Sequence, residues 1–525
     1  MLFRYEVRVS GQAPIRGDWE VQAGENRLVL PLPAGKLESV SVRGRLSLGE
    51  TEKIFMNGYQ TWTYCPEYGR LGSTPDVGPL PELLVRGLGI RSYGDYDFVP
   101  YPKGRGQTHG ESWCYFREGE RFRLFASLDE RPGYTLFSFD TSGGVLSIQR
   151  DCKGLKCGGN YHVFDLFFAA GGENEVFDAW FRALGVKPRT ERPIAGYCSW
   201  YNRYQKISAE TIRNDLRGCA GQLAPGDLFQ IDDGWEPRVG DWLAADRKKF
   251  PEGMRAAADA IHQKGFQAGL WLAPFAAQRS SRLFREHPNW FLQKNGRPWL
   301  AGIGWGGFYA LDIDKPQVID YLERVFSRVL EDWDYDLVKL DFLYAAAPFG
   351  RSTETRAGRM IRAMELLRRL CGEKKILGCG VPLMPAFGLA DYCRVGCDVS
   401  LDWDNTPLMR RTNRERPSTR QAIGNTIYRR QLNGRAFLSD PDVFFLREEN
   451  LKLSKEQKRT LAEVNALFGG VLLHSDDMSR WSGEARDFYQ RLLRLRDAEQ
   501  IRVHSGYGLA VSYVLDGREE TLYIE

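Results

Sequence analysis

The chain has 525 residues, of which 43% are hydrophobic and 27% charged, an ordinary composition for a globular protein of roughly two to four domains. Its 72 basic and 68 acidic residues give a net charge of +4 without any basic or acidic block, which argues against nucleic acid and against a strongly charged partner. No run of about 18 apolar residues and no signal-peptide pattern is present, so we expect no membrane association.

The first 187 residues predict an antiparallel β-sandwich. Short alternating segments, for example 28–30, 122–125 and 136–139, are separated by Gly, Pro and Asp. A helix is expected over 173–184, followed by a linker that ends at Pro193.

Residues 188–478 predict a (β/α)₈ TIM barrel, because short apolar runs alternate with amphipathic helices over a length suited to this fold. The open doubly wound sheet is the alternative, but no Gly-rich phosphate turn follows the first strand. Helices are expected over 209–219, 316–333 and 357–370. The eight predicted strands are 194–200, 228–231, 267–272, 337–340, 376–379, 392–395, 436–438 and 471–474.

The last segment, 479–525, predicts a small C-terminal β domain, with one helix over 483–498 and short strands such as 508–514 and 522–524. The fold class is therefore α/β, a barrel flanked by two β domains.

The cysteines and histidines give no sign of a disulfide framework or a metal centre. The ten Cys are scattered, so we expect buried thiols and a cytoplasmic location. None of the six His lies at a zinc-like spacing from a Cys, and we expect no metal and no cofactor.

Carboxylates gather at the predicted carboxyl ends of the barrel strands, where TIM-barrel active sites lie. Asp232 and Asp233 end the second strand, Asp341 ends the fourth, and Asp398 follows the sixth. Further acids follow the last two strands, and shaping of the loop or capping of a helix explains them: Asp440, Asp442, Asp476 and Asp477.

Carboxylates around an aromatic cavity suit glycoside cleavage, in which one group attacks or stabilises the sugar and another protonates the leaving oxygen. The 14 Trp of the chain supply flat rings for sugar faces, although core packing alone also explains them. Lys339 lies two residues before Asp341 on the same strand face, which keeps that carboxylate ionised. Capping of helices is the alternative for each acid taken alone.

The motifs Ile231-Asp232-Asp233-Gly234-Trp235, Lys339-Leu340-Asp341 and Arg394-Val395-Gly396-Cys397-Asp398 resemble those of glycoside hydrolase family 36 α-galactosidases, over most of the chain. The resemblance implies Asp341 as nucleophile and Asp398 as general acid/base. It also implies a substrate-binding set made of Asp232, Asp233, Lys339, Arg394, Trp271, Cys379, Trp200 and Trp62.

The sequence departs from the family pattern at two places. Position 343 is Leu where many members have Asn, and the turn after the fifth strand reads Cys379-Gly380-Val381-Pro382 in place of Cys-Ser-Gly-Gly-Gly. In the family both positions face the side of the sugar that carries O2, so the resemblance leaves open whether the substrate carries an N-acetyl group there. Asp402 and Asp404 are the rivals of Asp398 for the acid/base role.

The predicted activity is hydrolysis of terminal α-linked galactose from oligosaccharides with retention of configuration. The alternatives are an α-N-acetylgalactosaminidase, a galactosyl transferase, an α-glucosidase of a related barrel family, and an inactive sugar-binding protein on the same scaffold. The expected partner is an α-galactoside oligosaccharide, and a homo-oligomer is one option for the assembly.

Overall fold

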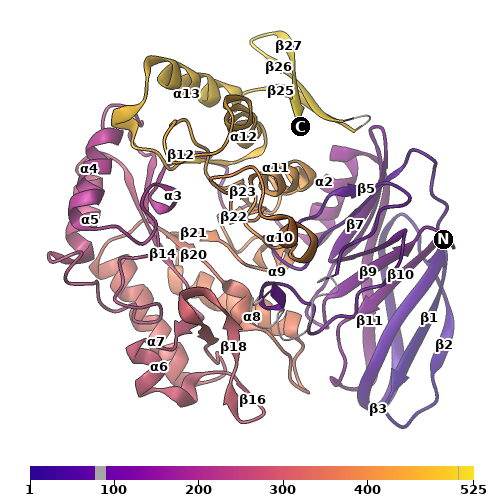
Figure 1. Ribbon diagram of the computed structural model, residues 1–525. Helices are drawn as coiled ribbons and strands as arrows, with labels where there is room; N and C mark the ends of the chain where they lie inside the picture. Colours follow the sequence, from indigo (N-terminus) through magenta and orange to yellow (C-terminus); the bar gives the residue numbers. More distant parts are fainter. Residues whose placement is uncertain (77–89, 506–507, 525) are drawn as a thin grey trace.

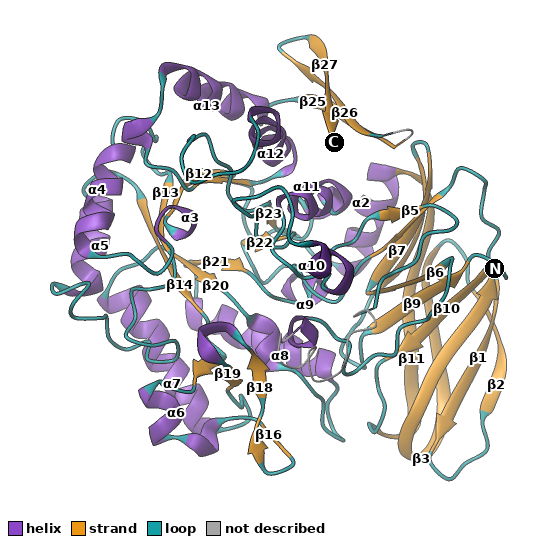
Figure 2. Cartoon of the chain, in the orientation of Figure 1, coloured by secondary structure: helices purple, strands orange, loops and turns teal. Residues whose placement is uncertain are grey.

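The N-terminal part of the computed structural model is built almost entirely from antiparallel strands (Figures 1 and 2). The structure describes residues 1–76, 90–505 and 508–524. The strands of this part are β1 (Leu2–Val9), β2 (Ile15–Glu20), β3 (Gly24–Arg45), β4 (Lys53–Met56), β5 (Glu67–Tyr68), β6 (Gln107–Glu111), β7 (Trp113–Glu118), β8 (Arg121–Ser127), β9 (Thr135–Asp140), β10 (Val145–Arg150) and β11 (Lys156–Gly172).

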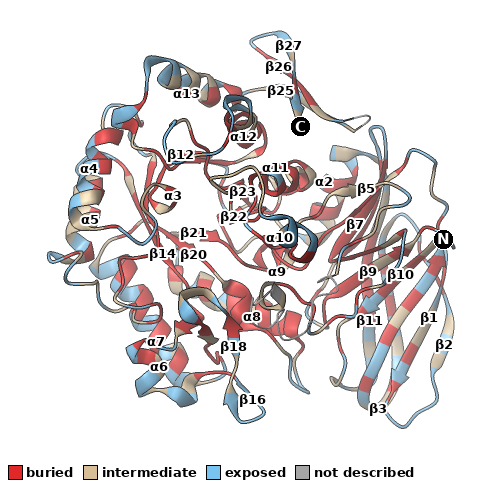
Figure 3. Cartoon of the chain, in the orientation of Figure 1, coloured by how far each residue is buried: buried red, intermediate tan, exposed pale blue. Residues whose placement is uncertain are grey.

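Strand β3 connects the two layers of this β-sandwich. Its first half, residues 24–36, pairs with β11, and its second half pairs with β1 and β10. Alternating residues of β1, such as Phe3, Val7 and Val9, are buried, which is the period-two pattern of a strand with one wet face (Figure 3). The buried side chains of the layers form one apolar cluster, and the predicted antiparallel sandwich is confirmed.

Parallel strands form the barrel, as predicted, and they are buried along nearly their whole length because helices cover them outside and side chains fill them inside (Figure 3). An isolated bridge between Phe444, in the loop after the seventh strand, and His474, at the end of the eighth, brings the barrel close to closure. In the order of the chain these strands are β12 (Ile194–Cys198), β13 (Leu228–Ile231), β14 (Gln267–Leu272), β20 (Leu337–Leu340), β21 (Lys375–Gly378), β22 (Tyr392–Arg394), β23 (Leu438–Asp440) and β24 (Val471–His474).

Four predicted strands have other bounds in the structure. The fifth and sixth, predicted as 376–379 and 392–395, differ from β21 and β22 by no more than one residue at either end. The first strand ends at Cys198, because the chain turns into a short helix that begins at Trp200. The seventh strand runs over Leu438–Asp440 instead of 436–438, because pairing with β22 begins only at Leu438. The buried residues before it belong to the turn that is closed by the Asn433–Phe437 bridge.

Helices surround the barrel (Figure 2), and side-chain caps start several of them. Ser208 and Ser454 each accept a hydrogen bond from the backbone three residues on, which fixes where α4 and α12 begin. The helices are α2 (Glu173–Leu184), α3 (Trp200–Arg203), α4 (Ala209–Cys219), α5 (Gly253–His262), α6 (Arg282–Glu286), α7 (Pro316–Ser327), α8 (Arg356–Cys371), α9 (Leu383–Ala386), α10 (Pro407–Thr412), α11 (Thr419–Tyr428), α12 (Lys455–Phe468) and α13 (Gly483–Leu495).

The predicted helices over 173–184 and 209–219 are confirmed by α2 and α4. The predicted helix over 316–333 is α7, which continues as a π-helical turn over Arg328–Asp332. Within the described ranges, no helix combines the length and the apolar character needed to cross a bilayer.

Smaller sheets complete the chain. Two lie in the segment after β14: β15 (Ala276–Gln278) pairs with β19 (Phe308–Ala310), which pairs with β18 (Leu300–Gly302), and β16 (Gln293–Lys294) pairs with β17 (Arg297–Pro298). The C-terminal strands β25 (Glu499–Ser505), β26 (Leu509–Leu515) and β27 (Arg518–Ile524) form an antiparallel sheet beyond α13 (Figure 1). The domain boundaries at 187/188 and 478/479 stay predictions.

A loop of the sandwich, residues 57–65, is docked onto the barrel through one buried arginine. Arg429, at the end of α11, is fully buried. Its guanidinium donates to the Asn57 side chain at 3.1 Å and to the carbonyl oxygens of Gln60 and Thr61 at 3.2 and 2.7 Å. It also donates to the carbonyl of Val395 at 2.8 Å, so one side chain joins the sandwich loop to the segment that follows β22.

We predict that Arg429→Met lowers the free energy of unfolding by about 3 kcal/mol or more, because several buried acceptors lose their donors at once. Urea denaturation followed by tryptophan fluorescence measures the effect. Arg43→Met, at an exposed position of β3, is the control and should change stability by less than about 0.5 kcal/mol. Equal midpoints for Arg429→Met and the unaltered chain would contradict the role of this arginine.

Candidate active site

A cavity of about 470 Å³ lies at the carboxyl ends of the barrel strands. It receives side chains from β13, β14 and β20, from loops of the barrel, and from the sandwich loop 57–65. Its lining consists of Trp62, Tyr93, Trp200, Gln205, Asp232, Asp233, Trp271, Ile303, Gly304, Trp305, Lys339, Asp341, Phe342, Asp398, Met409, Asn413, Glu415 and Pro417.

Asp341 follows β20 and is held by two donors. Its carboxylate accepts a hydrogen bond from the indole N–H of Trp271 at 3.1 Å and from the backbone N–H of Phe342 at 2.8 Å. Phe342 has a φ of 53°, a left-handed conformation that is uncommon for a bulky residue and marks a constrained position. Only 8% of Asp341 is exposed, and this carboxylate is therefore oriented before any ligand arrives.

Burial raises the pKa of Asp341, and the negative charge of Asp398 raises it further. The ammonium group of Lys339 opposes both effects and lowers this pKa. The charge of Asp341 therefore depends on a neighbouring carboxylate and a neighbouring cation.

Lys339 is buried in β20 and forms an ion pair with Asp232 at 2.8 Å. Asp232 also accepts from the amide of Gln230 at 2.8 Å, while its own backbone N–H donates to the Ser199 hydroxyl at 2.9 Å. A buried ammonium requires such compensation, because an isolated one would cost several kcal/mol.

Asp233 is fixed by groups from three segments. It accepts from the Gln205 amide at 2.8 Å and from the Trp305 indole at 2.9 Å. Burial and the charge of Asp233, to which it is hydrogen-bonded, raise the pKa of Glu236 well above its usual range. Trp305 reaches this position from a left-handed backbone with a φ of 54°.

Asp398 lines the same cavity as Asp341, and its side chain is 41% exposed. Arg394, which ends β22, donates to it at 2.8 Å and is itself buried. The same guanidinium donates to Asp442 at 3.0 Å and to Asp440 at 3.3 Å. Asp442 in turn accepts from the Tyr201 hydroxyl at 2.7 Å and from the backbone N–H of Val399 at 2.8 Å, so it braces the residue next to Asp398.

Aromatic rings wall the cavity on the side of the sandwich. Trp62 packs edge-on against Phe342 with ring centroids 5.1 Å apart, and its indole donates to the sulfur of Cys379 at 3.4 Å. Gly380, with a φ of 57°, permits this approach, because a Cβ there would lie 3.0 Å from the Trp62 ring and 2.9 Å from the Phe342 nitrogen.

The structure brings most of the predicted site residues to this one cavity. Arg394 and Cys379 are buried directly behind it, against Asp398 and Trp62 respectively. Of the two rivals of Asp398, Asp404 is paired with Arg416 at 3.0 Å, and Asp402 lines a neighbouring cavity. The predicted residues that line the site cavity itself are Asp341, Asp398, Asp232, Asp233, Lys339, Trp271, Trp200 and Trp62.

Sequence reasoning missed several lining residues that come from loops. Trp305 lies in the Gly-rich stretch 302–307, and this composition was the available signal for a tight turn around a partly buried ring. Glu415 is a further buried carboxyl, to which the Tyr96 hydroxyl donates at 3.0 Å. Tyr93 from the sandwich lies within 5.8 Å of the Trp62 ring and had no recognisable signal.

Opposed carboxylates in an aromatic cavity at the mouth of a (β/α)₈ barrel are the arrangement of a glycoside hydrolase. The comparisons agree with this class. The model of the melibiase family matches residues 188–363. An α-galactosidase structure from Thermus thermophilus is 29% identical, covers 98% of each chain and superposes with a TM-score of 0.75. The chain is thus similar to the melibiase family over this barrel segment and to an α-galactosidase over its whole length.

More distant relatives share parts of the chain. The α-galactosidase AgaA of Geobacillus stearothermophilus is 31% identical over 187 residues, which is 33% of this chain and 25% of that protein. A protein from Flavonifractor plautii named A type blood α-D-galactosamine galactosaminidase is 34% identical over 133 residues, 24% of this chain and 12% of that protein. The aligned segments thus span a quarter or less of these curated relatives' own length.

The cluster around Arg394 generates a prediction about stability and pH. Burial raises the pKa of Asp442 to about 6, and the charges of Asp398 and Asp440 add to this rise, whereas Arg394 opposes it. The pKa of an aspartate in the unfolded chain is about 3.9, so the native chain binds the proton of Asp442 more tightly than the unfolded chain does. The contribution of Asp442 to native stability therefore falls as the pH rises from about 4 to about 6.

Asp442→Asn removes the titrating carboxyl. Between about pH 4 and about pH 6 the free energy of unfolding of this variant should therefore decline by about 2 kcal/mol less than that of the unaltered chain. Urea unfolding at several pH values from about 4 to about 6.5 measures the difference. Asp18→Asn, at an exposed position of β2, is the control and should follow the unaltered chain. Parallel curves for Asp442→Asn and the unaltered chain would remove Asp442 as the titrating group.

Proposed function

We propose that the protein is a retaining α-galactosidase that releases terminal α-linked galactose from oligosaccharides. The observation that carries this proposal is that Asp341 and Asp398 line one cavity, the first fixed and buried, the second more exposed and held by a cation. A nucleophile must be oriented and ionised, whereas an acid/base must exchange a proton with the leaving oxygen and with water.

In the proposed reaction Asp341 attacks the anomeric carbon while Asp398 protonates the glycosidic oxygen. The bond to the leaving group breaks, and a galactosyl–Asp341 ester remains. Asp398, now a carboxylate, takes a proton from water, and the oxygen of this water displaces Asp341 from the anomeric carbon. Two inversions give galactose of the original α configuration.

Selectivity for galactose would come from the polar side of the cavity. Asp232 and Asp233 supply acceptors for the axial O4 and for O6, and Lys339 supplies a donor for sugar hydroxyls. Because these groups are already held by Ser199, Gln205 and Trp305, they lose little freedom on binding. Arg394 acts through Asp398, whose carboxylate it contacts. The Thermus thermophilus relative has been crystallised with p-nitrophenyl α-D-galactopyranoside and with stachyose, which supports a galactoside substrate.

A second candidate activity concerns the C2 position of the sugar. The Flavonifractor plautii relative is named a galactosaminidase, and this chain departs from the family pattern at Leu343 and in the Cys379-Gly380 turn, which we expect to lie near C2. Paired assays with nitrophenyl α-galactoside and nitrophenyl α-N-acetylgalactosaminide separate the two activities.

For the location we propose the cytoplasm, because the ten cysteines, all in the described part of the chain, are free thiols and nine are buried.

We predict that Asp341→Asn lowers kcat on nitrophenyl α-galactoside by at least about a thousandfold, because the amide cannot form the glycosyl ester. Asp259→Asn, on the exposed side of α5, is the matched control and should retain full activity. Circular dichroism verifies that both variants are folded. Turnover near the unaltered rate in Asp341→Asn would eliminate this residue as the nucleophile.

We further predict that Lys339→Met moves the acidic limb of the kcat/KM profile to higher pH. Lys339 lowers the pKa of Asp341, so its loss raises that pKa, and a smaller fraction of the nucleophile is ionised at a given acidic pH. The same change at Lys153, which is exposed in the sandwich, should leave the limb in place. A limb that stays put or moves to lower pH in Lys339→Met would refute this electrostatic role.

A further inference from the structure

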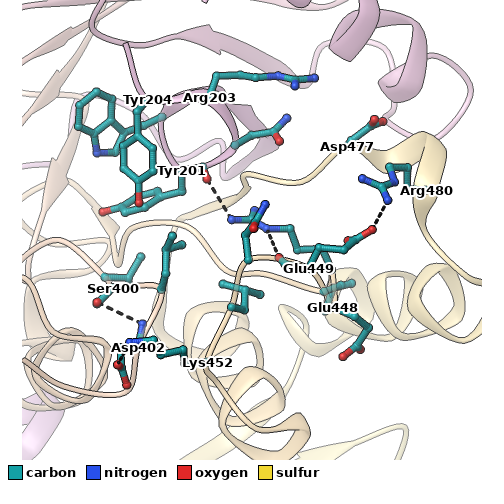
Figure 4. Close-up of a pocket in the computed structure, with 18 of the residues that line it drawn as sticks. Tyr201, Arg203, Tyr204, Ser400, Asp402, Glu448, Glu449, Lys452, Asp477 and Arg480 are labelled. Carbon is teal, nitrogen blue, oxygen red and sulfur yellow. Dashed lines mark hydrogen bonds and ion pairs between the residues drawn. The ribbon is translucent and has the colours of Figure 1, made fainter. Parts of the chain in front are cut away.

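A second and larger cavity, of about 1180 Å³, opens beside the site just described (Figure 4). The loops that follow β12, β22, β23 and β24 form it. Its lining consists of Trp200, Tyr201, Asn202, Arg203, Tyr204, Lys206, Asp398, Val399, Ser400, Leu401, Asp402, Pro417, Leu446, Arg447, Glu448, Glu449, Asn450, Leu451, Lys452, Asp477, Arg480, Trp481, Ser482 and Ala485.

The two cavities meet at one acid. Trp200, Asp398 and Pro417 line both, whereas Asp341 lines only the smaller one. If Asp398 is the group that protonates the glycosidic oxygen, the leaving group departs past Asp398. The larger cavity therefore lies on the leaving-group side of the scissile bond, and the smaller one holds the galactosyl ring.

The chemistry of the larger cavity fits a neutral, polyhydroxylated ligand. Its basic side chains are matched in number by its acidic ones, five of each, so it offers no net charge to an anion or a cation. Several of them are paired: Lys452 with Asp402 at 3.2 Å, and Arg480 with Glu449. Such fixed polar groups present donors and acceptors to hydroxyls, while the balance of charge disfavours ionic ligands.

An aromatic platform stands next to the shared acid. Tyr204 is 40% exposed and packs edge-on against Trp200 with ring centroids 5.1 Å apart. Its backbone has a φ of 50°, a left-handed conformation that is rare for a bulky residue and marks a constrained functional position. Figure 4 shows Tyr204 and Arg203 along one side of the cavity and Asp402, Lys452 and Glu448 along the other. An exposed ring facing polar groups across a gap suits the apolar face of a sugar.

We propose that this cavity is a saccharide-binding site for the leaving group, with Tyr204 as its stacking residue, and that it selects oligosaccharides extending two or more sugar units beyond the cleaved galactose. Its volume exceeds the roughly 300–1,000 Å³ of most small-molecule sites, which leaves room for more than one ring. This inference rests on the proposed function.

The test compares kcat/KM on α-galactosyl fluoride, whose leaving group carries no sugar, with kcat/KM on melibiose, raffinose and stachyose, whose leaving groups carry one, two and three sugar units. In the unaltered enzyme KM should fall from melibiose to stachyose. In Tyr204→Ala the ratio of kcat/KM for raffinose to that for α-galactosyl fluoride should fall about three- to tenfold, the equivalent of one lost aromatic contact. Tyr204→Phe, which keeps the ring, should restore the ratio.

Tyr523→Ala, which removes a ring that is 77% exposed on β27, is the matched control and should leave the ratio unchanged. The inference is overturned if KM is equal for melibiose and stachyose, or if Tyr204→Ala lowers activity on the fluoride and on raffinose by the same factor. Failure of the proposed function looks different, because the unaltered protein would then cleave neither the fluoride nor any α-galactoside.

Discussion

Two buried cations set the architecture of the barrel mouth. Lys339 and Arg394 are almost fully removed from water, and each is compensated by carboxylates near the ends of the barrel strands: Asp232 for the lysine, and Asp398, Asp440 and Asp442 for the arginine. Removing charge from water costs several kcal/mol per ion unless such partners are present. These ion pairs therefore hold the acids at the strand ends in fixed positions.

Closure of the site depends on contact between the sandwich and the barrel. Arg429 supplies hydrogen bonds to the 57–65 loop, and this places Trp62 against Phe342 and the sulfur of Cys379. The site is therefore shared between two parts of the chain that lie more than three hundred residues apart in sequence. The barrel supplies the carboxylates, and the sandwich completes the aromatic wall of the cavity.

The division of the mouth into two cavities gives each carboxylate a distinct environment. Asp341 lies in the smaller one between indole and backbone donors, where burial raises its pKa and the charge of Lys339 lowers it. Asp398 lies at the junction, exposed to the larger cavity and tethered by Arg394. Opposite environments for two acids are what a double displacement requires, since one must stay ionised while the other gains and loses a proton.

The sequence by itself determined the barrel strands, the helices α2 and α4, and the local motifs around Asp232 and Asp341, because apolar period and strand-end position are properties of neighbouring residues. Only the tertiary structure decided that Trp305 and Tyr93 reach the same site. Their positions depend on left-handed backbone at Trp305 and on a sandwich segment packed against the barrel at Tyr93. Each of these follows from contacts between distant segments, which leave no periodic trace in the chain.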